Sequence, residues 1–310
     1  MKAKTKGVIC GVIAAVSYGT NPLGALSLYQ EGVSVNSVLF YRYSLAALII
    51  LVLLIAKKES LLIKKAELKI VSLLGLLFAS SSLTLFTSFH YMDAGIASTL
   101  LFVYPIMVAV LMAVLFKEKI TVTTLISISL ALAGISLLTH GGDNNTLNST
   151  GVILVLISAL TYAIYIIIVN KSALKMSVYK LTFYVLVFCT LTTISYSLIG
   201  GGQPIQMLTS TSSWMYSLML AIVPTVISLI AMTVAVNLLG STPTAVMGAL
   251  EPLTAVIIGV TLFGEELTLS LLIGILIILA SVILIIAGKS ISIKAFLQLM
   301  HTHKTNIKLK

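Results

Sequence analysis

The amino-acid sequence predicts an all-α polytopic membrane protein, with ten transmembrane helices arranged as two inverted five-helix repeats and both termini in the cytoplasm. Composition is the first observation behind this prediction. The 310 residues are 59% hydrophobic and only 9% charged, with a mean hydropathy of +1.14. A soluble domain of this length needs far more charge to cover its surface. The other two observations are the recurrence of apolar segments along the whole chain and the duplication of one of them.

The apolar segments are long enough to be membrane spans. Crossing a hydrocarbon core of about 30 Å takes about 20 residues of helix. Measured against that length, the chain contains ten candidate spans, separated in places only by tight turns. They cover residues 7–29, 35–56, 67–90, 95–116, 122–139, 150–170, 177–199, 213–237, 243–263 and 268–287.

The duplicated segment indicates that the two halves of the chain are inverted. Pro105–Thr121 reappears in degenerate form as Pro252–Thr268, at an offset of 252 − 105 = 147 positions. The apolar run is kept, but Lys117-Glu118-Lys119 in the first copy becomes Gly264-Glu265-Glu266 in the second. A basic end and an acidic end are expected if the two copies cross the membrane in opposite directions. Inverted repeats of this kind are the architecture of many secondary transporters.

The basic residues predict the orientation. Cytoplasmic loops of membrane proteins carry an excess of Lys and Arg. If the N-terminus is cytoplasmic, every one of the 19 basic residues except Arg42 lies on the inner side. The predicted outer segments carry acids instead, namely Glu31, Asp93, Asp143, Glu265 and Glu266. We therefore expect a multi-pass protein of the cell membrane (inner or plasma membrane) with cytoplasmic N- and C-termini.

The domain organisation follows from the same pattern. A Gly- and Asn-rich polar stretch lies between the fifth and sixth spans and is typical of a linker. Because each half has an odd number of spans, the second half begins on the opposite side from the first. The predicted units are a first repeat, 1–140, an outer linker, 141–150, a second repeat, 151–288, and a basic cytoplasmic tail, 289–310.

Several short elements, taken in order, resemble a known family. Tyr41-Arg42-Tyr43 lies in the second span, Leu250–Ala255 in the ninth, and Leu262-Phe263-Gly264-Glu265 ends the ninth. Their order and spacing around ten spans resemble the EamA type of the drug/metabolite transporter superfamily, over nearly the whole chain. The resemblance implies a carrier of small organic solutes, often an exporter of amino acids or related metabolites. A proton-coupled or exchange-type importer and a multidrug exporter are the alternatives.

Two ionisable residues inside predicted spans are the main site candidates. A charge at the centre of a bilayer costs about 2.5–3.5 kcal/mol on insertion scales, so such residues face a cavity or a partner. We expect Arg42 and Glu251 to line a cavity near the membrane midplane, where one would face a substrate carboxylate and the other an ammonium group or a proton. The alternatives are a structural ion pair, or an Arg42 that satisfies nearby carbonyls.

Further candidates are polar or aromatic residues within spans. Asn21-Pro22 interrupts the first span, so Tyr18 and Asn21 are candidates to face the solute, with a packing kink as the alternative. Tyr104 and Tyr162 are candidate cavity walls, with core tyrosines as the alternative. Besides Glu251, His90 is a candidate proton site, and an interfacial histidine is the alternative.

Three other features have mainly structural interpretations. The first span carries a stripe of small residues at four-residue spacing, Gly7, Gly11, Ala15 and Gly19, which predicts a helix-contact face. Pro224 marks a candidate hinge in the eighth span. Glu265 and Glu266 are expected to be solvated, or to cap the tenth span.

The remaining expectations concern partners. The sequence contains no metalloprotease or phosphate-loop motif, so we expect no enzymatic activity, catalytic residues, cofactor or metal ion. A polytopic membrane enzyme and a channel are the less favoured alternatives. The lysines form short clusters between apolar runs, so we expect no nucleic-acid partner. The expected partners are the lipid bilayer and a small-molecule solute, and a homodimer is left open.

Overall fold

The computed structural model describes residues 3–117, 122–140, 148–172, 174, 176–200, 202–239, 244, 247–266 and 268–288. The predicted tail and residues 141–147 of the predicted linker lie outside these ranges. The helices of the first repeat are α1 (Ala3–Gly19), α2 (Asn21–Gln30), α3 (Val35–Ala56), α4 (Lys65–Ser88), α5 (Ala94–Leu101), α6 (Tyr104–Phe116) and α7 (Val122–His140). Those of the second repeat are α8 (Ser149–Lys171), α9 (Val178–Leu198), α10 (Thr211–Ala221), the π-helix η1 (Ile222–Ile227), α11 (Ser228–Leu239), α13 (Leu250–Phe263) and α14 (Leu269–Gly288).

The helices confirm the all-α polytopic membrane fold. Within the described ranges, seven helical stretches are long and apolar enough to cross a membrane. Three shorter apolar helices accompany them, at Val122–Leu137, Leu250–Phe263 and Leu272–Leu284. Together these stretches match the ten predicted spans one for one.

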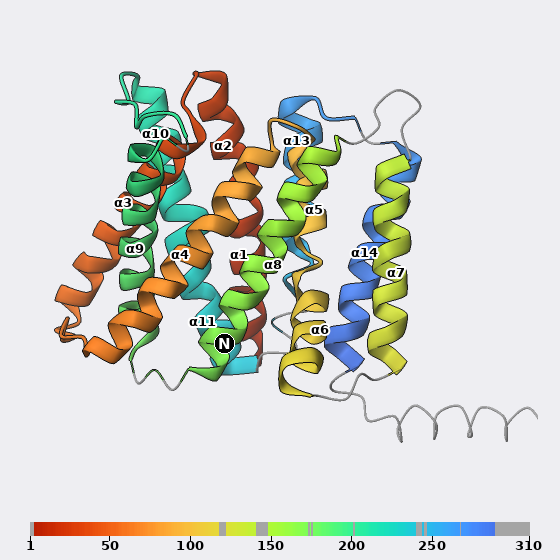
Figure 1. Ribbon diagram of the computed structural model, residues 1–310, viewed down its shortest axis with the longest axis horizontal. Coiled ribbons are helices and arrows are strands. Elements are labelled where there is room, and N and C mark those ends of the chain that lie inside the picture. Colours follow the sequence, from red (N-terminus) through yellow and green to blue (C-terminus); the bar gives the residue numbers. More distant parts are fainter. Residues whose placement is uncertain are drawn as a thin grey trace, which may run out of the picture.

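The two repeats run in opposite directions. In Figure 1, α1 begins at the lower edge of the bundle, where the N-terminus is marked, and α8 begins at the upper edge. We call the lower side the lysine face, because the described lysines lie at helix ends or connections on that side: Lys4, Lys6, Lys57, Lys58, Lys64, Lys65, Lys69, Lys117, Lys171 and Lys180. The opposite face carries Glu31, Asp93, Glu265 and Glu266.

The packing of the helices is that of two interlocked halves related by an approximate twofold axis. Each of the second, fourth and fifth spans packs against its own counterpart, in the pairs α3 with α9, α5 with α13, and α7 with α14. The first and third spans exchange partners, so that α1 packs on α11 and α4 packs on α8. This exchange is what a twofold axis requires, because the operation that converts α1 into α8 also converts α11 into α4.

One hydrogen bond is repeated by this symmetry. The Ser81 hydroxyl on α4 donates to the Ser158 carbonyl on α8 at 3.0 Å. At the offset of 228 − 81 = 147, the Ser228 hydroxyl on α11 donates to the Ala14 carbonyl on α1 at 2.9 Å. Each bond joins a third span to a first span of the other repeat, so the duplication has preserved a tertiary contact as well as a sequence pattern.

The fourth span is predicted as one helix but is broken at Phe102-Val103, between α5 and α6. Pro105 has no backbone N–H to donate to the Leu101 carbonyl, which explains the break. The ninth span has the equivalent turn at Gly248-Ala249, just before Pro252. The sequence therefore contained the signal in both copies.

The duplicated segments also end alike. Lys117 and Gly264, at equivalent positions, both adopt left-handed backbone conformations, with φ of 55° and 70°. The backbone N–H of each donates to a carbonyl five residues earlier, that of Met112 or that of Gly259. A left-handed residue is a common way to terminate a helix and satisfy its last carbonyls. Both copies of the duplicated segment therefore have the same local structure.

The small-residue stripe of α1 is the contact face that the sequence predicts. Gly7 lies against Leu239, and Gly11 lies against Met247. At Gly19 a Cβ atom would come within 2.6 Å of the backbone carbonyl oxygen of Glu251. The absence of a side chain at Gly19 therefore sets how closely α1 approaches the first turn of α13.

We expect Gly19→Ala to lower the free energy of unfolding, measured by thermal or denaturant unfolding in detergent. Alanine gains at most about 1 kcal/mol of helix propensity, whereas overpacking against rigid backbone costs about 1–3 kcal/mol. The control is Val16→Ile, which also adds one carbon but on the exposed side of the same helix. A Gly19→Ala protein as stable as the control would contradict the close packing.

Glu265 caps α5 and not the tenth span, so the expectation for this residue was wrong, whereas Glu266 is exposed, as expected. Its carboxylate accepts hydrogen bonds from the backbone N–H groups of Ala94 (2.7 Å) and Gly95 (3.1 Å), at the start of α5. The first N–H groups of a helix have no intrahelical partner and attract anions. Because α5 packs on α13, the end of α13 brings Glu265 to the N-terminus of α5, which belongs to the other repeat.

The cap is expected to respond to pH. Burial, with a contribution from Asp93, raises the pKa of Glu265, against the lowering effect of the two N–H donors. Burial and then Glu266 raise the pKa of Asp93 in the same way. A carboxyl whose pKa is raised in the folded state binds protons more tightly there, so its contribution to stability is present at low pH and is lost as pH rises through the raised pKa.

We therefore expect the stability of the wild-type protein relative to Glu265→Gln to fall as the pH rises above the ordinary range of carboxyl groups. The measurement is the thermal unfolding of both proteins across the acidic to neutral range. Glu266→Gln, a change at an exposed acid in the same loop, should follow the wild type more closely. Parallel pH profiles for wild type and Glu265→Gln would contradict the assignment.

Candidate functional site

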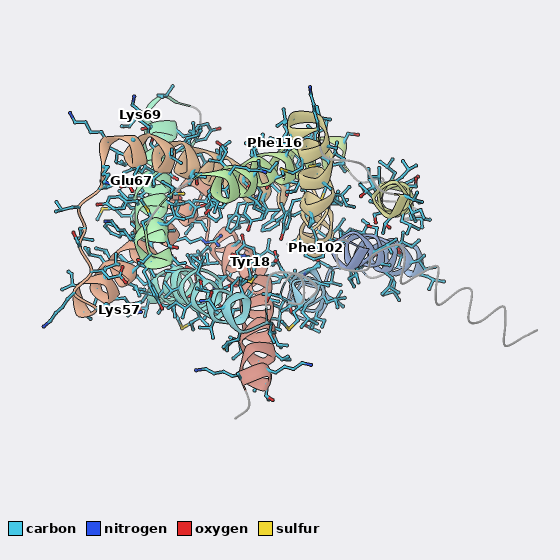
Figure 2. The ribbon with its side chains drawn as sticks, turned by 90° about the horizontal axis from the view of Figure 1, so that it is seen from below. Tyr18, Lys57, Glu67, Lys69, Phe102 and Phe116 are labelled. Atoms are coloured by element: carbon cyan, nitrogen blue, oxygen red, sulfur yellow. The ribbon has the colours of Figure 1, made fainter. Side chains whose placement is uncertain are left out.

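A cavity of about 220 Å³ lies in the interior of the bundle. Five of the predicted site residues line it, and they come from α1, α3, α6, α8 and α13: Tyr18, Arg42, Tyr104, Tyr162 and Glu251. In the view from below, Tyr18 lies near the centre of the bundle, whereas Lys57 and Lys69 lie at its periphery (Figure 2). The tertiary structure thus brings together residues that are up to 233 positions apart (251 − 18).

Equivalent positions of the two repeats line this cavity, and most differ in chemistry. Tyr18 has the counterpart Tyr162, but Glu251 is matched by Tyr104, Arg42 by Val185 and Thr225 by Phe78, and all eight line the cavity. The lining is therefore asymmetric, because a carboxylate, a guanidinium and a hydroxyl occupy three positions whose counterparts carry aromatic or aliphatic groups.

Arg42 is almost completely covered by protein. Its side chain, on the half of α3 farther from the lysine face, is 1% exposed, and its Nε donates to the Thr225 hydroxyl at 3.0 Å. The guanidinium carbon lies 5.3 Å from the centroid of the Phe86 ring and 5.8 Å from that of Tyr43. Within the described part of the chain, no carboxylate oxygen lies within 4.0 Å of it. The guanidinium is therefore held by a hydroxyl and aromatic faces instead of a direct ion pair.

The π-helix η1 explains why Thr225 can hold Arg42. Pro224 has no N–H to donate to the Leu220 carbonyl, four residues earlier. The Thr225 hydroxyl donates to that carbonyl at 2.9 Å, and the helix widens to π geometry over Ile222–Ile227. Since the hydroxyl hydrogen is used in this way, the oxygen is left to accept from Arg42. Sequence reasoning singled out Pro224 as a hinge candidate but missed Thr225.

Glu251 differs from Arg42 in being accessible from the cavity. It lies in the first turn of α13, just after the Gly248-Ala249 turn, and is partly exposed. Its carboxylate lies within electrostatic range of Arg42, Tyr18 and Tyr104. No described side chain makes a hydrogen bond to it, so its oxygens face the cavity with free acceptor capacity.

Another part of the lining, which we call the aromatic wall, is a cluster of aromatic rings from α4, α6 and α8. The Tyr104 and Tyr162 rings pack edge to face with centroids 4.8 Å apart, and Tyr162 stacks on Tyr165 at 5.8 Å. The ring centroids of Phe78 and Tyr165 are 5.4 Å apart. Sequence reasoning missed Phe78 and Tyr165. The position of Tyr165, three residues after Tyr162 on one helix face, was an available signal, whereas Phe78 had none.

The Asn21 side chain makes a hydrogen bond to the backbone and does not line the cavity. Pro22 leaves the Tyr18 carbonyl without its usual donor, and the Asn21 side-chain amide donates to that carbonyl at 2.8 Å. The residue is 5% exposed, and its amide oxygen has no hydrogen-bond partner in the part of the chain that the structure describes. Asn21 thus stabilises the break between α1 and α2, and its proposed contact with a solute stays a prediction.

His90 lies away from the central cavity. Its ring stacks on Tyr29 with centroids 4.6 Å apart, and both line a separate cavity of about 380 Å³ towards the face opposite the lysine face. The Tyr29 hydroxyl donates to the Phe86 carbonyl at 3.0 Å, which joins α2 to α4. Of the two predicted proton sites, only Glu251 belongs to the central cavity.

The fold and this cavity are those of a polytopic membrane protein with two inverted repeats, the class to which many carriers belong. The model of the EamA-like transporter family matches the chain twice, over residues 5–140 and 149–287. The chain therefore belongs to the EamA-like transporter family, and the resemblance recognised in its sequence is confirmed.

Similar proteins agree with this assignment. An "Uncharacterized transporter" of Archaeoglobus fulgidus is 30% identical over 62% of this chain and 67% of its own length. "Uncharacterized transporter YdfC" of Bacillus subtilis is 23% identical over 88% of this chain and 89% of its own. A solved crystal structure matches with a TM-score of 0.64 at 15% identity, over 91% of this chain and 96% of the other. The likeness to the crystal structure shows the fold alone.

We expect Thr225→Val to lower the free energy of unfolding by about 1–3 kcal/mol, since it leaves the buried Arg42 Nε and the Leu220 carbonyl unpaired. Thr225→Ser should recover most of this loss. The control is Thr233→Val in α11, whose hydroxyl only donates to a carbonyl of its own helix. Equal stability of Thr225→Val and Thr233→Val in detergent would show that the Arg42–Thr225 bond contributes nothing.

Proposed function

We propose that the protein is a secondary carrier of small organic solutes that works by alternating access, and that it exports amino acids or related metabolites. The observation that supports this function is the presence of two oppositely charged side chains, Arg42 and Glu251, on one interior cavity of an EamA-type fold. Such intramembrane charges are costly and mark substrate or ion pathways. Membership of a transporter family also points to transport and away from catalysis.

The size of the cavity supports a small metabolite over a drug. Pockets for drug-sized ligands measure about 300–1,000 Å³, whereas this cavity measures about 220 Å³. In this conformation, a multidrug exporter is therefore less well supported than a carrier of single small metabolites.

The proposed direction of transport, out of the cell, is based on the orientation of the chain and on how far the cavity extends. The excess of lysine on the lysine face supports a cytoplasmic location for that face and for both termini in the cell membrane. Arg42 lies seven residues from the opposite end of α3, about 10 Å deep at 1.5 Å per residue. From there the cavity extends to Thr182, four residues from the lysine-face end of α9. A cavity that reaches towards the cytoplasm is suited to load solute there, as an exporter requires.

Coupling to protons or to a counter-solute is a further part of the proposal. Glu251 is the ionisable side chain of the cavity with free acceptor capacity, so either a proton or a cationic group can occupy it. Transport that depends on an imposed pH gradient would favour proton coupling, and transport that depends on solute on the far side would favour exchange.

The test is transport by purified protein in proteoliposomes, with a panel of amino acids and related metabolites and with or without a pH gradient. We expect saturable transport that Arg42→Gln and Glu251→Gln each reduce at least about tenfold, the equivalent of about 1.4 kcal/mol. Glu31→Gln, which changes an exposed acid far from the cavity, is the control. Unchanged transport by both cavity variants at normal protein levels would refute the role of these residues.

A further inference from the structure

The two charges of the central cavity are not equally available to a solute. The Arg42 side chain is 1% exposed, its Nε is used by Thr225, and its guanidinium lies near the rings of Phe86 and Tyr43. Glu251 is partly exposed to the cavity and has no hydrogen-bond partner among the described residues. Both residues line the cavity, and Glu251 therefore offers a solute more accessible surface than Arg42 does.

The groups around Glu251 add to this preference. Tyr18, Tyr104 and Tyr162 each lie within electrostatic range of its carboxylate. Aromatic faces carry partial negative charge and attract cations. An ammonium group placed beside Glu251 would meet a carboxylate and tyrosine rings together, whereas a carboxylate placed there would be repelled by both.

The aromatic residues of the cavity favour a solute with an apolar body. Phe78 and Val185 are the counterparts of the polar residues Thr225 and Arg42, and the Tyr165 ring lies beside that of Phe78. Phe78, Val185 and Tyr165 offer apolar surface to the body of a bound molecule. The cavity thus combines a group that can bind a cation with apolar surface.

We infer that the cavity recognises small organic amines with an apolar body, and that it binds them through the ammonium group at Glu251 without reading a carboxylate. This inference rests on the proposed function and deepens it, because it names the group of the solute that is recognised. Arg42 then acts as a fixed positive charge held by Thr225, which balances Glu251 when the cavity is empty.

The experiment is isothermal titration calorimetry of the purified full-length protein with matched compounds on three carbon skeletons. Each set consists of an amino acid (leucine, methionine or phenylalanine), the amine made by removing its carboxylate, and the acid made by removing its amino group. For at least one skeleton, we expect the amine to bind within about threefold of the amino acid or more tightly. The acid should bind at least about thirtyfold more weakly, the effect of losing one buried charge pair.

Variants test the assigned group. Glu251→Gln should weaken amine binding at least about thirtyfold, whereas Glu251→Asp, which keeps the charge, should retain part of it. Tyr104→Phe keeps the ring and should bind more tightly than Tyr104→Leu. Thermal unfolding of each variant shows whether it is folded, and the comparison of amine with acid in the wild-type protein depends on no variant.

The outcomes separate this inference from the proposed function. Binding of the acids equal to or tighter than that of the amines, or no binding by any of the three amines, would overturn the inference. Amines that bind through Glu251 but do not move in proteoliposomes would support the inference and refute the carrier. Saturable transport restricted to acids that lack an amino group would leave a carrier and refute the inference.

Discussion

The hydrocarbon core of a membrane offers no water to complete a broken backbone hydrogen bond, and this constraint shapes the cavity. Pro22 and Pro224 each leave a carbonyl four residues earlier without its donor. At the first, the Asn21 amide donates to the Tyr18 carbonyl, and at the second the Thr225 hydroxyl donates to the Leu220 carbonyl. Both repairs are made by a polar side chain next to the proline. The second also creates the acceptor that holds Arg42.

Holding Arg42 in this way has a consequence for the whole site. A buried guanidinium needs partners for its N–H groups, and here one of them is a hydroxyl fixed by a π-helix of the other repeat. The positive charge is thereby held nearer to the face opposite the lysine face. Glu251, which lacks such a partner among the described residues, remains free to exchange partners, and that is the property a carrier site requires.

The approximate twofold axis explains both the regularity and the asymmetry of the molecule. Contacts that support the scaffold are duplicated, as in the bonds of Ser81 and Ser228 and in the left-handed ends at Lys117 and Gly264. Positions on the cavity are mostly not duplicated, since Glu251 corresponds to Tyr104 and Thr225 to Phe78. A symmetric frame around an asymmetric lining gives a site with chemically different groups, which can orient a solute.

The transmembrane scaffold could be predicted from the sequence more fully than the lining of the cavity. Hydropathy, lysine placement and the duplicated segment predicted ten spans and two inverted halves, because the length of an apolar helix and the charge of its flanks are local properties. Arg42 and Glu251 could also be identified from local sequence, because a charged residue within an apolar span is costly and therefore unusual. The break before Pro105 was missed, although its signal was local, because the span was judged by hydropathy alone.

The sequence by itself determined the class of the protein, the number and direction of its spans and the residues with unusual burial costs. Only the tertiary structure decided that Arg42 is held by Thr225 while Glu251 has no hydrogen-bond partner among the described residues, that Asn21 and His90 lie away from the central cavity, and that Glu265 caps α5. It also added Phe78 and Tyr165 to the lining. These outcomes depend on contacts between residues far apart in the chain, and a linear pattern of hydropathy and charge carries no information about which helix faces which.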